Sequence, residues 1–146
     1  MSNNQGNPQT SVPDIRHTVV FQAPIEKVWN AVSTSEGIAV WLMPNTFERT
    51  LGHEFTLEST YGTSYCKVTE LEPPHRLAFT WGEDWIVSFE LKDLGGSTEF
   101  TLVHSGWKAA EAVLPQARET TGVVRDRMNH GWGAVILPRL GQFVEA

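Results

Sequence analysis

The sequence predicts a single α+β domain in which one face of an antiparallel sheet wraps around a long C-terminal helix. Most of the chain consists of short segments in which apolar and polar residues alternate, with glycine or proline turns between them. The last segment, 123–144, instead spaces its large apolar residues by three and four positions, as on one face of a helix. This stripe consists of Met128, Trp132, Val135, Ile136, Leu140 and Phe143.

The N-terminal part of the domain is predicted to be a strand followed by two short helices. Residues 15–22 are rich in β-branched side chains and end at Ala23-Pro24, where proline favours the first turn of a helix. Apolar residues at helical spacing predict a helix over 25–32. Ser33-Thr34-Ser35 then offers a cap for a second helix over 36–41.

The middle of the chain predicts a run of strands. Consecutive strands with short connections are antiparallel neighbours, because a parallel pair needs a crossover of about a dozen residues or more. Alternate residues in these strands are apolar, so one face of the sheet is expected to be buried. The strands are predicted at 47–51, 54–58, 64–71, 76–81, 85–92 and 98–105. Segment 108–119 is expected to be a short helix or a loop over the mouth of a cavity.

Three residues are unfavourable inside the predicted terminal helix. Glycine costs about 1 kcal/mol and proline about 3 kcal/mol relative to alanine in a helix interior, so this helix must be held by packing. Gly131 and Gly133 would allow the backbone to approach the sheet closely beside Trp132. Pro138 would bend the helix between Ile136 and Leu140.

Composition and charge narrow the range of functions. The 146-residue chain is 40% hydrophobic, enough for the core of one domain over 14–146, whereas residues 1–13 are polar and are expected to be disordered. A formal net charge of -6 works against nucleic acid binding, which depends on Lys and Arg. No segment approaches the roughly 20 apolar residues that span a bilayer. We therefore expect a cytoplasmic protein that does not insert into membranes.

Cysteine and histidine residues indicate neither a disulfide nor a metal site. The single cysteine, Cys66, is expected to be a small buried strand residue. The histidines are scattered and lack the spacing of metal ligands, so we expect no metal and no cofactor. Alternation places His104 on the inward face of the last strand, where it could act as a general base or serve as a hydrogen-bonded core residue. The lack of a carboxylate visibly placed beside it favours the core residue.

Several segments, taken together, resemble the family of activators of heat-shock protein 90 ATPase homologues, within the START-related lipid-transfer superfamily. They are residues 23–29 (APIEKVW), 40–42 (VWL), 70–81 (ELEPPHRLAFTW), 101–107 (TLVHSGW) and 131–132 (GW). The resemblance implies a helix-grip fold, in which a curved sheet encloses the C-terminal helix and leaves an elongated internal cavity. It implies lipid or polyketide binding, with scattered cyclases and hydrolases, and no shared catalytic motif. The heat-shock activators carry an additional N-terminal domain without a counterpart in this sequence.

We therefore expect non-catalytic binding of a hydrophobic or aromatic small molecule, lipid- or polyketide-like, in an internal cavity. One alternative is a cyclase- or hydrolase-type enzyme that uses the same cavity with His104 as the base. Another is a protein-interaction module, for which a chaperone is a candidate partner. The expected cavity-lining residues are Trp41, Phe55, Phe79, Trp81, Phe89, Phe100, His104, Met128, Trp132, Val135, Ile136 and Leu140.

Overall fold

The computed structural model describes residues 12–60, 62–107, 113–114 and 119–146. Most of the stretch predicted to be disordered, 1–13, lies outside these residues. Within segment 108–119 the described residues belong to two short paired strands, β7 (Val113–Leu114) and β8 (Glu119–Thr120). The helix or loop predicted for the rest of that segment lies outside the described residues.

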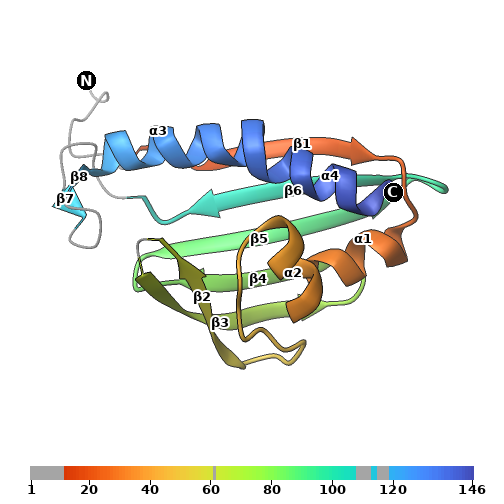
Figure 1. Cartoon of the computed structure of the whole chain (residues 1–146), viewed down its shortest axis with the longest axis horizontal. Helices are drawn as coiled ribbons and strands as arrows, with labels where there is room; N and C mark the ends of the chain where they lie inside the picture. The colour runs from red at the N-terminus through yellow and green to blue at the C-terminus, as the bar shows by residue number, and fades with distance from the viewer. Residues whose placement is uncertain (1–11, 61, 108–112, 115–118) are drawn as a thin grey trace, which may run out of the picture.

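The predicted α+β fold is confirmed. A six-stranded antiparallel sheet has the order β1-β6-β5-β4-β3-β2, so strands that follow one another in the chain are neighbours except where β1 pairs with β6. In Figure 1 the terminal helix runs along β1 and β6, and α1 and α2 lie over the middle of the sheet. The strands are β1 (Ile15–Phe21), β2 (Glu54–Ser59), β3 (Gly62–Glu72), β4 (Arg76–Trp81), β5 (Trp85–Asp93) and β6 (Thr98–Ser105).

The strand predicted at 47–51 is wrong, because that segment is an irregular loop; the isolated bridge in this part of the chain lies before it, between Asn45 and Leu57. The Asn45 side chain fixes the loop: its Oδ1 accepts from the Phe47 amide at 3.0 Å, and its Nδ2 donates to the Ser35 carbonyl at 3.1 Å. Phe47 is buried while Leu51 is 62% exposed. Phe47 and Leu51, the two apolar residues that suggested a strand, therefore do not share one buried face.

The two short helices form as predicted, α1 over Ile25–Val32 and α2 over Ser35–Trp41. Pro24 precedes the first turn of α1. The Thr34 hydroxyl accepts from the Gly37 amide at 3.1 Å and caps α2. The indole of Trp41 donates to the Ala31 carbonyl at 2.8 Å, which locks the two helices together.

The terminal helix is continuous but contains a π-helical turn. It consists of α3 (Thr121–Gly131), the π turn (Trp132–Ile136) and α4 (Leu137–Val144). The Leu137 amide donates to the carbonyl of Trp132, five residues earlier. A proline ring would clash with the carbonyl four residues before it in an α-helix. The wider turn therefore accommodates Pro138.

This turn changes which residues of the terminal helix are buried. Val135 and Phe143, both on the predicted stripe, are 45% and 37% exposed, so the stripe is wrong at these two positions. Leu137 and Val144 are buried instead, next to the correctly predicted Leu140. A turn wider than 3.6 residues shifts the helical pattern by about one position from that point on.

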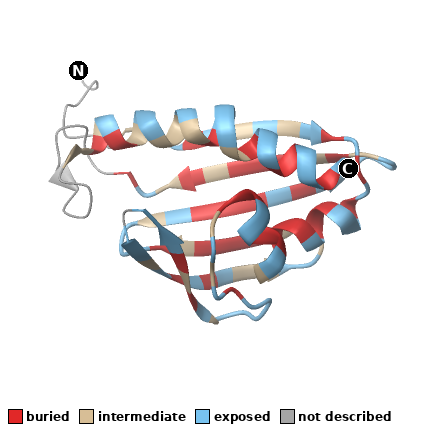
Figure 2. Ribbon diagram, in the orientation of Figure 1, coloured by how far each residue is buried: buried red, intermediate tan, exposed pale blue. Residues whose placement is uncertain are grey.

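The core is a continuous row of phenylalanine rings between the sheet and the helices. Neighbouring ring centroids are 5.2 to 5.9 Å apart, within the range of favourable aromatic pairs. Figure 2 shows the buried residues along the central strands and on the sides of the helices that face them. The row consists of Phe47, Phe55, Phe79, Phe89, Phe100 and Phe21.

Candidate functional site

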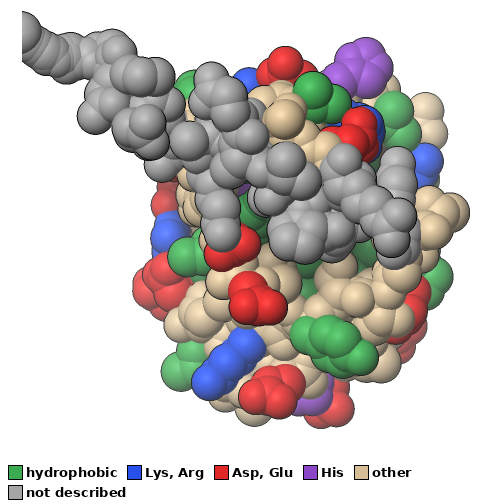
Figure 3. Space-filling view, turned by 90° about the vertical axis from the view of Figure 1, so that its left-hand side faces the viewer, with side chains coloured by type: hydrophobic (Ala, Val, Ile, Leu, Met, Phe, Trp, Pro, Cys, Tyr) green, Lys and Arg blue, Asp and Glu red, His purple; other side chains and the backbone are tan. Residues whose placement is uncertain are grey.

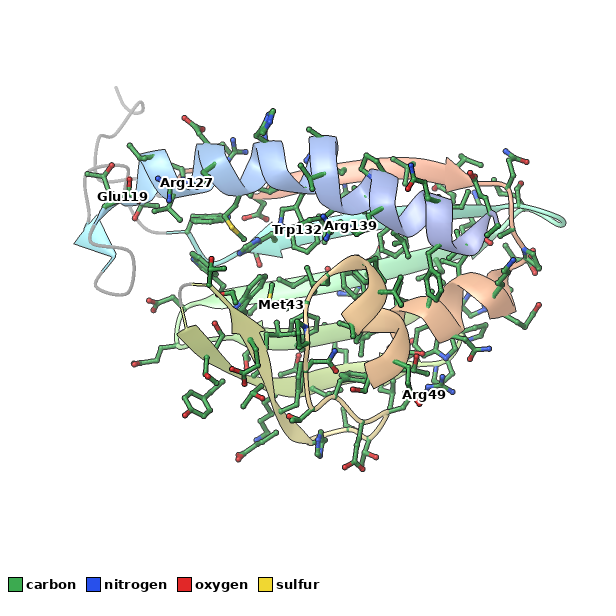
Figure 4. All side chains as sticks on the ribbon, viewed as in Figure 1. Met43, Arg49, Glu119, Arg127, Trp132 and Arg139 are labelled. Carbon is green, nitrogen blue, oxygen red and sulfur yellow. The ribbon has the colours of Figure 1, made fainter. Side chains whose placement is uncertain are left out.

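A pocket of about 250 Å³ lies where the N-terminal half of the terminal helix approaches the sheet. Four parts of the chain form it: the terminal helix, the facing ends of β2 and β3, the strand ends beside the turn between β4 and β5, and the loop that carries Met43. Figure 4 shows Arg127 on the helix and Met43 across from it. The pocket is lined by Met43, Ser59, Gly62, Thr63, Ser64, Trp81, Trp85, Val124, Arg127, Met128 and Ile136.

Two tryptophans dominate the apolar wall of this pocket. Trp81 ends β4 and Trp85 begins β5, and the two residues pair directly across the turn. Their rings meet edge to face, with centroids 5.8 Å apart and planes at 89°. The hairpin fixes both indoles, and the remaining apolar lining comes from Met43 and the helix residues, so the pocket presents a preformed aromatic surface.

Arg127 is the charged residue among the described lining of this pocket. Its guanidinium pairs with the carboxylate of Glu119 on β8 at 2.7 Å. The hydrogen bond from Arg127 holds the pKa of the Glu119 carboxyl below its ordinary value. Figure 4 shows Glu119 and Arg127 together at the N-terminal end of the helix. The pocket thus combines aromatic walls with one cationic group at its rim.

Behind this wall, His104 is enclosed by four indole rings. His104 is fully buried, and its ring centroid lies 4.7 to 6.2 Å from those of Trp81, Trp85, Trp107 and Trp132. The Trp132 indole N–H donates to His104 Nδ1 at 3.1 Å, and the Trp107 indole donates to the His104 carbonyl at 2.9 Å. Trp81 and Trp85 therefore both line the pocket and contact His104, which is not itself a lining residue.

The hydrogen bond from Trp132 determines the chemistry of His104. An indole N–H only donates, so Nδ1 is the unprotonated nitrogen and the proton of the neutral ring is on Nε2. Burial lowers the pKa of His104 to about 3, so the ring is neutral at physiological pH. Nε2 is buried without a hydrogen-bond partner among the described residues. With its basic nitrogen engaged, this histidine is not arranged as a general base.

The structure separates the sequence-predicted site residues into four groups. Trp81, Met128 and Ile136 line the pocket, and His104 and Trp132 lie behind it. Val135 is 45% exposed and does not line the pocket. The others are packed in the core, where Trp41 lies against Phe89 at 5.7 Å; these are Trp41, Phe55, Phe79, Phe89, Phe100 and Leu140.

Several lining residues of the pocket are not among those predicted from the sequence. Trp85 pairs with Trp81 across a short turn, and this spacing was the one local signal that could have identified it. Met43 lies in a loop, and Arg127 precedes Met128 on the helix. Met43 and Arg127 line the same pocket because of tertiary packing, which the spacing of residues in the sequence does not indicate.

The described part of the chain shows no group of three or more His, Cys, Asp or Glu side chains that could hold a metal ion. Over the same residues, no helix combines the length and the apolar character needed to cross a membrane. Cys66 is buried, and burial raises the pKa of its thiol to about 12, so this cysteine is not activated as a nucleophile.

Solved structures similar to this chain share its whole fold. Protein BH1534 from Bacillus halodurans is 48% identical, with 93% of this chain and 99% of that chain covered and a TM-score of 0.87. The Aha1 dimer from Colwellia psychrerythraea is 21% identical, with coverages of 92% and 97% and a TM-score of 0.74. CalU16 from Micromonospora echinospora is 22% identical, with coverages of 92% and 81% and a TM-score of 0.70.

The family model described as activator of Hsp90 ATPase homolog 1-like protein matches residues 22–145. No protein of curated function matches the chain significantly. The two structures below 25% identity support the helix-grip fold alone, whereas the family match covers nearly the whole domain and BH1534 is similar in sequence as well. The chain therefore belongs to the family of activator of Hsp90 ATPase homolog 1-like proteins.

Proposed function

We propose that this protein binds a small hydrophobic or aromatic molecule in the pocket beside Trp81 and Trp85, without catalysing a reaction. The observation that carries the proposal is the pocket itself, with two fixed indoles and further apolar side chains around about 250 Å³ of space. An engineered apolar cavity of about 150 Å³ holds benzene, so this volume suits a ligand with one or two aromatic rings. Binding of lipid- or polyketide-like molecules, implied by the resemblance to the START-related superfamily, agrees with such a site.

The lining supports binding better than catalysis. General acid–base chemistry needs a titratable group within hydrogen-bond reach of the substrate. Arg127 is the ionisable group among the described lining residues, and a guanidinium remains protonated throughout the physiological range. His104 lies behind the two indoles with its basic nitrogen already hydrogen-bonded to Trp132. The proposed role of the pocket is therefore to hold a molecule.

Titration with an uncharged two-ring probe, 2-acetylnaphthalene, tests this function. We expect saturable binding and thermal stabilisation, since a ligand at a hundred times its dissociation constant adds about 2.7 kcal/mol to the free energy of unfolding. Trp85→Ala and Met128→Ala should each weaken binding, because both remove apolar contact surface from the pocket. Val135→Ala is the matched control on the exposed side of the same helix.

Two results would oppose the proposal. One is the absence of any thermal shift or saturable signal across a panel of one- and two-ring aromatic compounds and fatty acids. The other is binding that Trp85→Ala and Met128→Ala leave unchanged, since the ligand would then occupy another part of the molecule.

A further inference from the structure

We propose that the natural ligand of this pocket is an aromatic molecule with one acidic group, and that this group pairs with Arg127 in place of Glu119. The inference rests on the proposed binding function and adds the chemical class of the ligand. An aryl carboxylate is the simplest member of this class.

The division of the lining into apolar and charged parts supports this class. Trp81, Trp85 and Met128 offer an apolar surface to a ring system. Arg127 lies on the same wall as Met128, one position earlier on the helix, so a ligand seated against the indoles has a guanidinium at its edge. A guanidinium presents paired N–H donors that match the two oxygens of a carboxylate.

Glu119 already shows that a carboxylate fits against Arg127. Their ion pair is short, at 2.7 Å, yet the side chains are 45% and 38% exposed for Arg127 and Glu119. Solvent screens such a pair, so its net contribution is small and a second carboxylate can replace the first at little cost. Glu119 is not among the lining residues, so its pair with Arg127 marks a carboxylate position at the edge of the pocket, which the acidic group of the ligand takes in the complex.

Because the whole molecule is negatively charged, selectivity for an acidic ligand requires a cationic group such as Arg127 in the pocket. The chain carries a formal net charge of -6. Figure 3 views the end of the molecule that holds the β2–β3 and β4–β5 hairpin ends and shows both acidic and basic side chains on this face. The net negative charge of the chain repels anions at long range. A preference for an acidic ligand must therefore come from a local contact, and Arg127 provides it within the described lining.

The test compares two probes that have the same rings and differ in charge, 2-naphthoate and 2-naphthamide, each titrated against the full chain at low ionic strength. The wild-type protein should bind 2-naphthoate about three- to tenfold more tightly than 2-naphthamide, as expected for a partly exposed charge-assisted contact. Arg127→Gln should abolish this preference, with the affinity for 2-naphthoate falling more than the affinity for 2-naphthamide. A thermal unfolding curve for this variant establishes that it is folded.

Glu119→Gln gives the opposite result, because it removes a carboxylate that competes with the ligand for Arg127. Its affinity for 2-naphthoate should increase about three- to tenfold, with little change for 2-naphthamide. Asp126→Asn is the matched control, since it removes one negative charge from the position next to Arg127 and leaves the Arg127–Glu119 pair in place. It should change the affinity for 2-naphthoate less than Glu119→Gln does.

The outcomes separate this inference from the proposed function. Equal affinities for the two probes, unaffected by Arg127→Gln, would overturn the acidic-ligand inference and leave aromatic binding intact. An equal gain in Glu119→Gln and Asp126→Asn would also overturn it, because the effect would then be one of overall charge. Binding of neither probe would remove the basis of both proposals.

Discussion

The indole N–H of Trp132, at the start of the π turn, donates to Nδ1 of His104 on β6 over 3.1 Å, and both residues are fully buried. This hydrogen bond joins the terminal helix to the sheet directly behind the pocket wall. It also fixes the tautomer of the neutral His104 ring, because Nδ1 must carry no proton in order to accept the hydrogen bond from Trp132.

Replacement of Trp132 tests this link. Trp132→Phe keeps an aromatic ring but leaves Nδ1 of His104 without its donor. We expect the free energy of unfolding in urea to fall by about 1 to 3 kcal/mol, the usual cost of an unsatisfied buried polar group. Trp85→Phe, at a half-buried position, is the control and should cost clearly less. Equal losses in the two variants would contradict a special role for the Trp132–His104 hydrogen bond.

The buried His104 should make stability depend on pH below neutrality. Its pKa is lowered from 6.5 to about 3 in the folded state by burial, so between these values the unfolded chain binds the proton and the folded chain does not. Stability therefore falls as pH decreases through this range, and the contribution of His104 between pH 7.5 and pH 5 is about 2 kcal/mol.

The measurement is urea unfolding at both pH values for the wild type and for His104→Gln, whose amide oxygen can still accept from Trp132. The variant should lack most of this pH-dependent loss. His130→Gln, at an exposed position, should retain it. The same pH dependence in all three proteins would show that His104 does not titrate as expected.

The phenylalanine row predicts which aromatic residues serve stability. Phe79 is 2% exposed and touches both Phe55 and Phe89, so Phe79→Ala should reduce the free energy of unfolding by about 3 to 5 kcal/mol. Val135→Ala, at a position 45% exposed, should change it by no more than about 0.5 kcal/mol. Denaturant unfolding measures both. A small effect of Phe79→Ala would indicate a loosely filled core.

Gly131 and Gly133 should respond differently to alanine. Gly131 has helical dihedral angles and open space around the position of an added Cβ, so Gly131→Ala should stabilise the protein by about 0.5 to 1 kcal/mol. A Cβ on Gly133 would lie 3.0 Å from Cε1 of His17, whose ring is held by a 2.9 Å hydrogen bond to Asn129. Gly133→Ala should therefore be less favourable than Gly131→Ala. Thermal unfolding compares them, and the reverse order would show that the His17 ring moves freely.

The strands from 54 onward and the two short helices could be predicted because their signals are local. Alternation and turn residues mark the strands, and Pro24 and Thr34 mark the helix starts. The π turn could not be predicted in this way, since the spacing of apolar residues does not mark a local change of helical period. The expected close approach at Gly133 is present, against His17, whereas the space around Gly131 is open.

The pocket could be predicted only in part, for a different reason. Its residues come from a loop, two hairpins and a helix, so their meeting is a product of packing rather than of spacing. Inward-facing rings such as Phe79 and Phe89 fit a cavity wall and a filled core equally well in sequence. The structure shows that they fill the core.

The π turn also sets where the length of the terminal helix can change without loss of the core. Removal of one residue from Trp132–Ile136 would let this segment close as an ordinary α-helix. Because the wide turn holds one residue more than an α-helical turn, every later position would keep its direction around the helix axis. Leu140 and Val144 would still face α1 and α2, against which α4 packs. A single-residue deletion here should thus damage the fold less than a deletion elsewhere in the helix, where every later position would rotate by about 100° around the axis.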